Sequence, residues 1–326
     1  MNYKMTAYVL GKMLGVEALV LCIPAAVSLI YGETSDMAAF GITSAVLCVF
    51  FLLFGRKKPE NGRIYGKDGL VIVAAAWILW SVFGALPFYL SREIPSYVDA
   101  LFETVSGFTT TGSTILTDIE ALSYGMNFWR CLTHWIGGMG VLVFVMVVTS
   151  LDDKSSMHLM RAEVPGPEAD KLVPKARETA KLLYAMYLAL TVAEIIFLLA
   201  GGMNLYDSII HSFSTAGTGG FANHNSSVAY YDSAYIDGVI TVFMILFGIN
   251  FNMYFLLLIK DVKSVWKNEE VRAYLGIIVA ATLVITCNVL SIYKEPLKAF
   301  RYSIFQVASI LSLIHISEPT RHAQIS

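Results

Sequence analysis

The stretch PSYVDALFETVSGFTTTGST at residues 95–114 decides the fold. It begins as a short half-apolar helix, ends in threonine and glycine, and lies between two apolar segments that are each long enough to cross a bilayer. Lipid offers no hydrogen bonds to the backbone, so irregular polar backbone at that depth is tolerated only where it is buried in protein or lines a water-filled cavity. The stretch therefore predicts a pore helix followed by a pore-lining loop.

A second stretch, NLYDSIIHSFSTAGTGGFANHNSS at residues 204–227, repeats this arrangement in a constant register. When Asp99 is laid on Asp207, Ser106 falls on Ser214 and Gly112 falls on Gly220. Internal repeats of this kind are common in transport proteins. We therefore interpret span, half-helix, polar loop and span as one repeating unit.

A third copy begins in FRYSIFQVASILS at residues 300–312, where Gln306 stands at the position of Glu103. This register requires a glycine at position 315, but the sequence has His315. The chain then reads LIHISEPTRHAQIS, which has neither membrane periodicity nor a filter-like pattern. We expect the tail over residues 312–326 to be non-native and the third copy to be incomplete.

The composition is that of a membrane protein. Of 326 residues, 56% are hydrophobic and 15% are charged, whereas a soluble domain carries about 25% charged residues. The net charge of −2 without a basic patch does not favour nucleic acid as a partner. Seven runs are long enough to span a bilayer, near residues 7–30, 37–54, 70–90, 127–150, 180–201, 235–259 and 273–293.

Lysine and arginine gather in alternate loops, which the positive-inside rule places in the cytoplasm together with the N-terminus. The first apolar run has no signal-peptide cleavage pattern and is expected to remain a helix. The basic residues are Arg56, Lys57, Lys58, Arg63 and Lys67, then Lys154, Arg161, Lys171, Lys175 and Arg177, then Lys260, Lys263, Lys267 and Arg272.

The predicted fold class is an all-α membrane protein made of helix, pore-helix, filter-loop and helix units behind an N-terminal two-helix hairpin. The expected parts are the hairpin over 1–68, a first pore repeat over 69–152, a second over 153–265, a partial third over 266–311 and the tail over 312–326.

The two polar loops are the candidate ion-binding site. A permeating cation exchanges its water shell for oxygen ligands, and glycine allows backbone conformations that turn carbonyl oxygens toward a pore. The C-terminal dipole of each half-helix adds partial negative charge there. The predicted filter residues are Thr109, Thr110, Thr111 and Gly112, with Gly217, Thr218, Gly219 and Gly220.

Plainer interpretations of these residues stay open. The loops also fit external turns, and a phosphate loop is disfavoured because no lysine follows the glycines and no strand precedes them. The glycines Gly137, Gly138 and Gly140 are typical of close helix packing beside the filter, not of a dinucleotide site, because they lie within a span. The cysteines are expected to be buried free thiols: Cys22, Cys48, Cys131 and Cys287.

Ionisable residues in or near the spans are functional hypotheses by default, although internal hydrogen bonding or snorkelling explains them equally well. For both histidines we favour structural hydrogen bonding over metal ligation. The residues are Glu17, Glu194, Arg130, His134 and His211.

The segments FETVSGFTTTGST, HWIGGMG, HSFSTAGTGGF, GINF and FRYSIFQVASI together resemble the Trk/Ktr/HKT superfamily of cation transporters, up to about residue 311. The N-terminal hairpin makes the chain most similar to the TrkH/TrkG branch of potassium uptake membrane subunits.

The resemblance implies potassium uptake across the cytoplasmic membrane through four repeats around one pore, with Gly112 and Gly220 as the first two filter glycines. It also implies a homodimer with a cytosolic nucleotide-binding regulatory subunit of the TrkA type, and no cofactor beside potassium as substrate. Gly112 favours potassium, because serine at that position is associated with sodium preference in the plant branch. Without the rest of the third repeat and the fourth, we expect a fragment without transport activity of its own.

Two rival functions remain. A non-conducting scaffold or assembly subunit would bind a cytosolic partner through the loop over 152–178. An intramembrane enzyme would use His134 and His211, or Glu103 and Glu194, but no HExxH or paired-acid motif supports it. We expect that the protein is not an enzyme.

Overall fold

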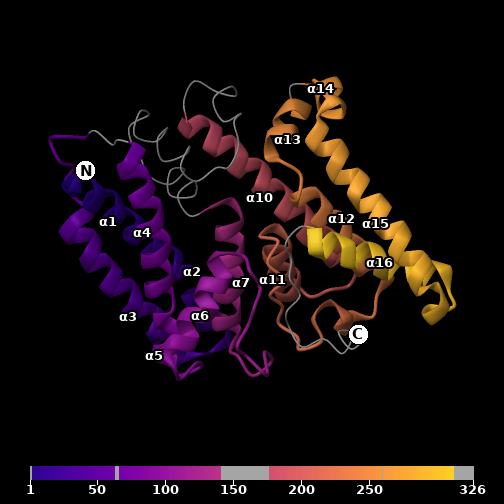
Figure 1. The fold of residues 1–326 in the computed structure, drawn as a ribbon. Helices are drawn as coiled ribbons and strands as arrows, with labels where there is room; N and C mark the ends of the chain where they lie inside the picture. Colours follow the sequence, from indigo (N-terminus) through magenta and orange to yellow (C-terminus); the bar gives the residue numbers. More distant parts are fainter. Residues whose placement is uncertain (1, 63–65, 141–175, 259, 312–326) are drawn as a thin grey trace. The chain divides into compact units, whose positions relative to one another are not determined.

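The structure is a computed structural model that describes residues 2–62, 66–140, 176–258 and 260–311, and every regular element in these ranges is helical (Figure 1). The all-α prediction is confirmed for this part of the chain. Five of the described helices are long and apolar enough to cross a membrane, and they coincide with predicted spans one, two, three, five and seven. They are Tyr3–Tyr31, Thr34–Gly55, Lys67–Ser91, Lys181–Ala200 and Glu269–Tyr293.

The chain divides into two compact units, residues 1–109 with 114–184 and residues 110–113 with 185–326. The described helices of the first unit are α1 (Tyr3–Val20), α2 (Cys22–Tyr31), α3 (Thr34–Phe50), a π-helical turn (Phe51–Gly55), α4 (Gly66–Gly84), α5 (Leu86–Ser91), α6 (Tyr97–Phe108) and α7 (Tyr124–Met139). Helix α10 (Ala176–Ala200) leads into the second unit, which holds α11 (Leu205–Ala216), a 3-10 turn (Ser227–Tyr231), α12 (Ala234–Phe247), α13 (Phe251–Leu258), α14 (Val262–Lys267), α15 (Glu269–Tyr293) and α16 (Pro296–Leu311).

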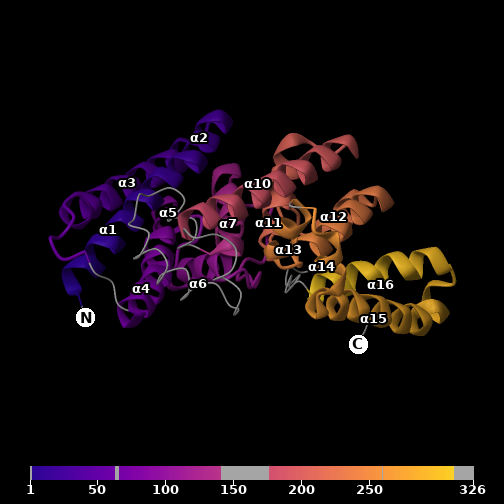
Figure 2. The ribbon, with the colours of Figure 1, turned by 90° about the horizontal axis from the view of Figure 1, so that it is seen from above.

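The N-terminal hairpin is packed into the first unit. Helix α1 lies against α3 and α4, and α2 lies against α3 and α7, as Figure 2 shows for the neighbouring ribbons of α2 and α3. The Glu33 carboxylate accepts the backbone N–H groups of Tyr124 and Gly125 at 2.7 and 2.9 Å, which caps the start of α7. The rings of Tyr31 and Tyr124 stack 4.0 Å apart beside this cap. The hairpin therefore helps to position the helix that follows the first polar loop.

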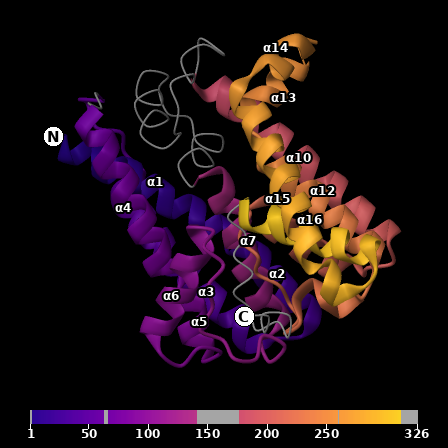
Figure 3. The same cartoon turned by 45° about the vertical axis from the view of Figure 1, so that its right-hand side comes forward.

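The second unit has a core shared by α10, α12 and α16. Figure 3 shows α15 and α16 side by side, and α16 also packs on α12. In lipid, close van der Waals packing of this apolar cluster holds these helices together. Its buried members are Leu198, Met203, Ile236, Ile240, Met244, Phe305 and Ala308.

Predicted span six, over 235–259, is not one continuous helix. Helix α12 ends at Phe247 and α13 begins at Phe251. The hydroxyls of Tyr254 and Tyr274 donate to the carbonyls of Leu246 and Ile245 at 2.6 and 3.2 Å, so carbonyls at the end of α12 keep partners despite the break. The prediction of a single span was wrong here because hydropathy does not register such caps.

Two other predictions need qualification. Only residues up to Gly140 of predicted span four are described, and the loop over 152–178 and the tail over 312–326 lie almost wholly outside the described residues. All four cysteines are free, but only Cys131 is buried. The other three are exposed because they lie on outward faces of apolar helices, so their predicted burial was wrong.

Candidate functional site

The two predicted half-helices have the same length and the same N-terminal cap. In α6 the Ser96 hydroxyl accepts the backbone N–H of Asp99 at 3.4 Å, and in α11 the Asn204 side chain accepts that of Asp207 at 2.8 Å. Each helix has 12 residues and runs from its cap to the polar loop. These matching caps agree with the register of the sequence repeat and direct two helix C-termini at the loops.

The backbone after each half-helix alternates in hand. Thr110 has φ of 56° and Gly112 has φ of 74°, and the equivalent residues Thr218 and Gly220 have φ of 55° and 89°. Thr111 and Gly219, the residues between, are not among those with positive φ. Alternation between positive and negative φ turns successive carbonyls toward one side, whereas successive carbonyls of an extended strand point to opposite sides.

Glycine is needed at fewer filter positions than the sequence suggested. Gly112 and Gly220 adopt the left-handed conformation as predicted, but Gly217 has φ of −76° and Gly219 has no positive φ. A threonine takes the other left-handed position of each loop, which costs roughly 1–2 kcal/mol relative to an ordinary conformation. Such strain in two equivalent loops is typical of a functional segment.

A buried ion pair holds the first loop from behind. The Glu103 carboxylate on α6 accepts a hydrogen bond from Arg130 Nε of α7 at 2.5 Å, and both side chains are fully buried. The same carboxylate accepts the Thr114 hydroxyl at 2.9 Å and the Ile115 backbone N–H at 3.1 Å. Glu103 therefore anchors the chain just after Gly112, while Arg130 neutralises its charge.

Close packing fixes the end of α6. The Phe108 ring contacts Trp80 and Trp129 edge to face, at 5.6 and 5.9 Å between centroids. A Cβ atom added to Gly137 would overlap the Phe108 carbonyl oxygen. The predicted close packing at this glycine is thereby confirmed, against the end of α6.

The second loop is held by a different carboxylate. Asp207 accepts hydrogen bonds from Asn223 at 2.5 Å, Tyr231 at 2.7 Å and Asn204 at 2.8 Å, and His224 Nε2 lies 3.5 Å away. Burial by itself would raise the pKa of Asp207, but the hydrogen bonds from His224, Tyr231 and Asn223 lower it to about 2. The carboxylate is therefore ionised at neutral pH and ties the outgoing chain to the start of α11.

The remaining ionisable candidates are all buried: Glu17, His134, Glu194 and His211. Among the described residues, His211 Nε2 and both carboxylate oxygens of Glu17 have no hydrogen-bond partner. The expected hydrogen bonding of His211 is therefore not found at this nitrogen. The described ranges also contain no group of three or more histidine, cysteine, aspartate or glutamate residues arranged to hold a metal ion.

Sequence reasoning missed the anchoring roles of Glu103, Arg130 and Asp207. A signal for the first pair was present, because a buried charged side chain is normally paired and these two residues lie in consecutive apolar elements. No local pattern marked Asp207, since its partners Asn223 and Tyr231 become neighbours only when the loop folds back.

Comparison with known proteins gives a consistent result. The family model "TrkH: Cation transport protein" matches residues 37–311. The Trk system potassium uptake protein TrkH of Escherichia coli (strain K12) is 34% identical over 318 residues, covering 95% of this chain and 65% of that protein. TrkG of the same strain, also named a Trk system potassium uptake protein, is 31% identical over 319 residues with the same coverage.

A solved structure shares the fold. The crystal structure of the potassium transporter TrkH from Vibrio parahaemolyticus matches with a TM-score of 0.82 and 30% identity, over 95% of this chain and 64% of that chain. The present chain thus spans a little under two thirds of the length of these relatives.

Proposed function

The chain belongs to the TrkH cation transport family, and from this premise we propose that it takes part in potassium uptake through a channel-like pore lined by backbone carbonyls. The proposed ion-binding residues are Thr109, Thr110, Thr111, Gly112, Gly217, Thr218, Gly219 and Gly220. Potassium is the substrate, and the chain's residues do no covalent chemistry in this proposal.

One observation carries the proposal: two loops that are far apart in the sequence share the same alternation of backbone hand. An external turn needs only one such reversal, and nothing requires it to recur at equivalent positions of two loops. Carbonyl oxygens turned to one side replace the water shell of a cation. The C-termini of α6 and α11 each add partial negative charge at the loop that follows them, which favours a cation over an anion.

The wider organisation is part of the proposal. The hairpin over 1–68 is followed by the repeats over 69–152, 153–265 and 266–311. The protein lies in the cytoplasmic (inner) membrane with its N-terminus in the cytoplasm. The relatives' names support potassium as the ion. Gly112 at the first filter position favours potassium over sodium. A homodimer with a cytosolic nucleotide-binding subunit of the TrkA type completes the proposed assembly.

The test is uptake of potassium and sodium in a bacterial strain that lacks its own potassium uptake systems. The chain, and separately the longest open reading frame that contains it, is expressed with Gly220→Ala or with Gly202→Ala. Gly202 is the matched control, because it has φ of 87° and open space where a Cβ would stand, but lies outside both loops.

We expect rescue of potassium-limited growth by the unaltered longer reading frame, with loss of rescue or of preference for potassium in its Gly220→Ala variant but not in its Gly202→Ala variant. The two variants carry a similar backbone strain, so a difference between them reports the filter. Unchanged preference in Gly220→Ala would count against the filter assignment. Failure of both expressed forms to take up potassium would count against potassium uptake itself.

A further inference from the structure

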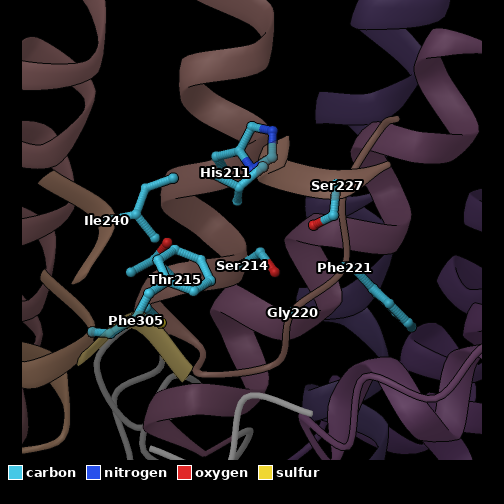
Figure 4. A pocket seen from close by; sticks show the side chains of 10 residues that line it. His211, Ser214, Thr215, Gly220, Phe221, Ser227, Ile240 and Phe305 are labelled. Carbon is cyan, nitrogen blue, oxygen red and sulfur yellow. The ribbon is translucent and has the colours of Figure 1, made fainter. Parts of the chain in front are cut away.

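A small cavity lies behind the second filter loop. Its volume is about 30 Å³, and its walls come from α11, α12, α16 and the loop itself. Figure 4 shows His211, Ser214 and Thr215 reaching it from α11, with Gly220 on the loop that passes beside them. A cavity needs roughly 10–15 Å³ of such space to hold a water molecule, so this one is large enough for a water.

The cavity stands where the first repeat has its buried ion pair. In the register that lays Ser214 on Ser106, His211 falls on Glu103. Counted from the caps that precede α7 and α12, Ile240 falls on Arg130, and Ile240 also lines the cavity. A charged pair in one repeat is thus replaced by a neutral pair in the other.

Three polar side chains face this space. His211 Nε2 and the Ser214 hydroxyl are buried and have no hydrogen-bond partner among the described residues. The Ser227 hydroxyl also lines the cavity, and Figure 4 shows it turned toward that of Ser214. Buried polar atoms are normally satisfied, and a buried water typically makes about three hydrogen bonds. The cavity therefore has the room and the polar partners for one water molecule, although most of its lining is apolar.

The imidazole of His211 is neutral at physiological pH. The pKa of His211 is lowered to about 4, because burial and, to a smaller degree, His224 lower it by more than the nearby Asp207 raises it. A neutral ring offers Nε2 as either donor or acceptor, according to its tautomer, and needs no counter-ion. Ile240, at the position of Arg130, cannot neutralise a charge, so the residue at the position of Glu103 must be uncharged.

We propose that this cavity binds one water molecule, held by His211, Ser214 and Ser227, which supports the backbone of the second filter loop at Gly220. His211 is then a positioning residue, and the water does for the second loop what the Glu103 carboxylate does directly for the first. The inference rests on the proposed function only in treating residues 217–220 as a filter loop, and its test requires no ion flux.

The first measurement detects the water. The whole chain is labelled with ¹⁵N-histidine and placed in lipid bilayers, and solid-state NMR follows magnetisation transfer from water to the imidazole nitrogens. His211→Gln identifies the signal of His211 by its disappearance. We expect transfer to His211 from a water that does not exchange rapidly with the bulk. Absence of this transfer would overturn the proposal.

The second measurement reads the loop by hydrogen exchange. The Gly219 N–H donates to the Ser214 carbonyl at 3.0 Å, so exchange at residues 217–222 reports how firmly the loop is held. His211→Leu removes the polar partner and should speed exchange there roughly two- to tenfold, the effect of losing one net hydrogen bond. Exchange at residues 109–114 should not change, because Glu103 holds that loop.

Matched variants separate positioning from general stability. His211→Gln keeps a neutral donor and acceptor and should exchange like the wild type, whereas Ile236→Val removes a methyl group from the same core without touching the cavity lining. If glutamine behaves like leucine, or if Ile236→Val speeds exchange as much, the proposal is wrong. If His211→Leu does not fold, the NMR signal of the water and the hydrogen exchange of His211→Gln still test the proposal.

Discussion

The buried pair of Glu103 and Arg130 offers the sharpest test of how the first loop is held. Glu103→Gln removes the charge but keeps one oxygen, which at the position of Oε2 accepts from both Thr114 and Ile115. It leaves the Arg130 guanidinium fully buried opposite a neutral amide. Removing one member of a buried ion pair costs about 3–5 kcal/mol, because the remaining charge has lost its compensation.

The double variant Glu103→Gln with Arg130→Met should recover most of that loss. Neither charge is then buried, methionine fills much of the arginine volume, and the glutamine still receives two hydrogen bonds. Replacing a whole buried pair in this way is often close to neutral, so we expect a net cost of about 0–2 kcal/mol. Arg130→Met alone should fall between the two, since Thr114 and Ile115 continue to bond the carboxylate. The resulting coupling energy is about 2 kcal/mol or more.

Equilibrium unfolding in mixed detergent and SDS micelles, followed by tryptophan fluorescence, measures these free energies. Glu120→Gln is the control, because it makes the same chemical change at an exposed position and should stay within about 0.5 kcal/mol of wild type. A loss in Glu103→Gln of less than about 1 kcal/mol would refute the reasoning. A double variant that loses the sum of the two single losses would refute it as well.

Three further predictions concern His211, Gly137 and Asp207. Burial lowers the pKa of His211 from 6.5 to about 4, so its neutral form contributes its full stability above pH 6.5. The free energy of unfolding should fall by about 3 kcal/mol as the pH drops toward 4, because the unfolded chain takes up the proton first. Melting temperatures at pH 7.5 and 4.5 should show this loss in the wild type and not in His211→Gln. Gly137→Ala should lower the free energy of unfolding by roughly 1–3 kcal/mol, because the added methyl group clashes with the Phe108 carbonyl. Gly41→Ala is the control: its methyl group meets open space on α3 and should not lower stability in the detergent and SDS unfolding assay. Asp207→Asn should lower the unfolding midpoint at pH 5, and the gap to wild type should close as the pH falls through about 2, where the carboxylate of the wild type takes up its proton.

Much of the candidate site could be predicted because its signals are local. The register between the two loops follows from the order of apolar, threonine and glycine residues, and the structure repeats it in the caps of α6 and α11 and in the φ angles of Thr110 and Thr218. Hydropathy located five long apolar helices for the same reason. It did not locate the break after Phe247, because tyrosine hydroxyls from α13 and α15 satisfy the carbonyls there.

By itself the sequence determined the class of protein, the position of five of its apolar spans, and the two loops, since hydrophobic period and glycine placement depend only on neighbouring residues. Tertiary structure alone decided what stands behind each loop. Glu103 meets Arg130 only because α6 packs on α7, and His211 lines a cavity only because α12 packs on α11 and α16 supplies Phe305 to its wall. Such pairings depend on distances between segments, which no local pattern contains, and they determine whether an ion pair or a water supports the loop.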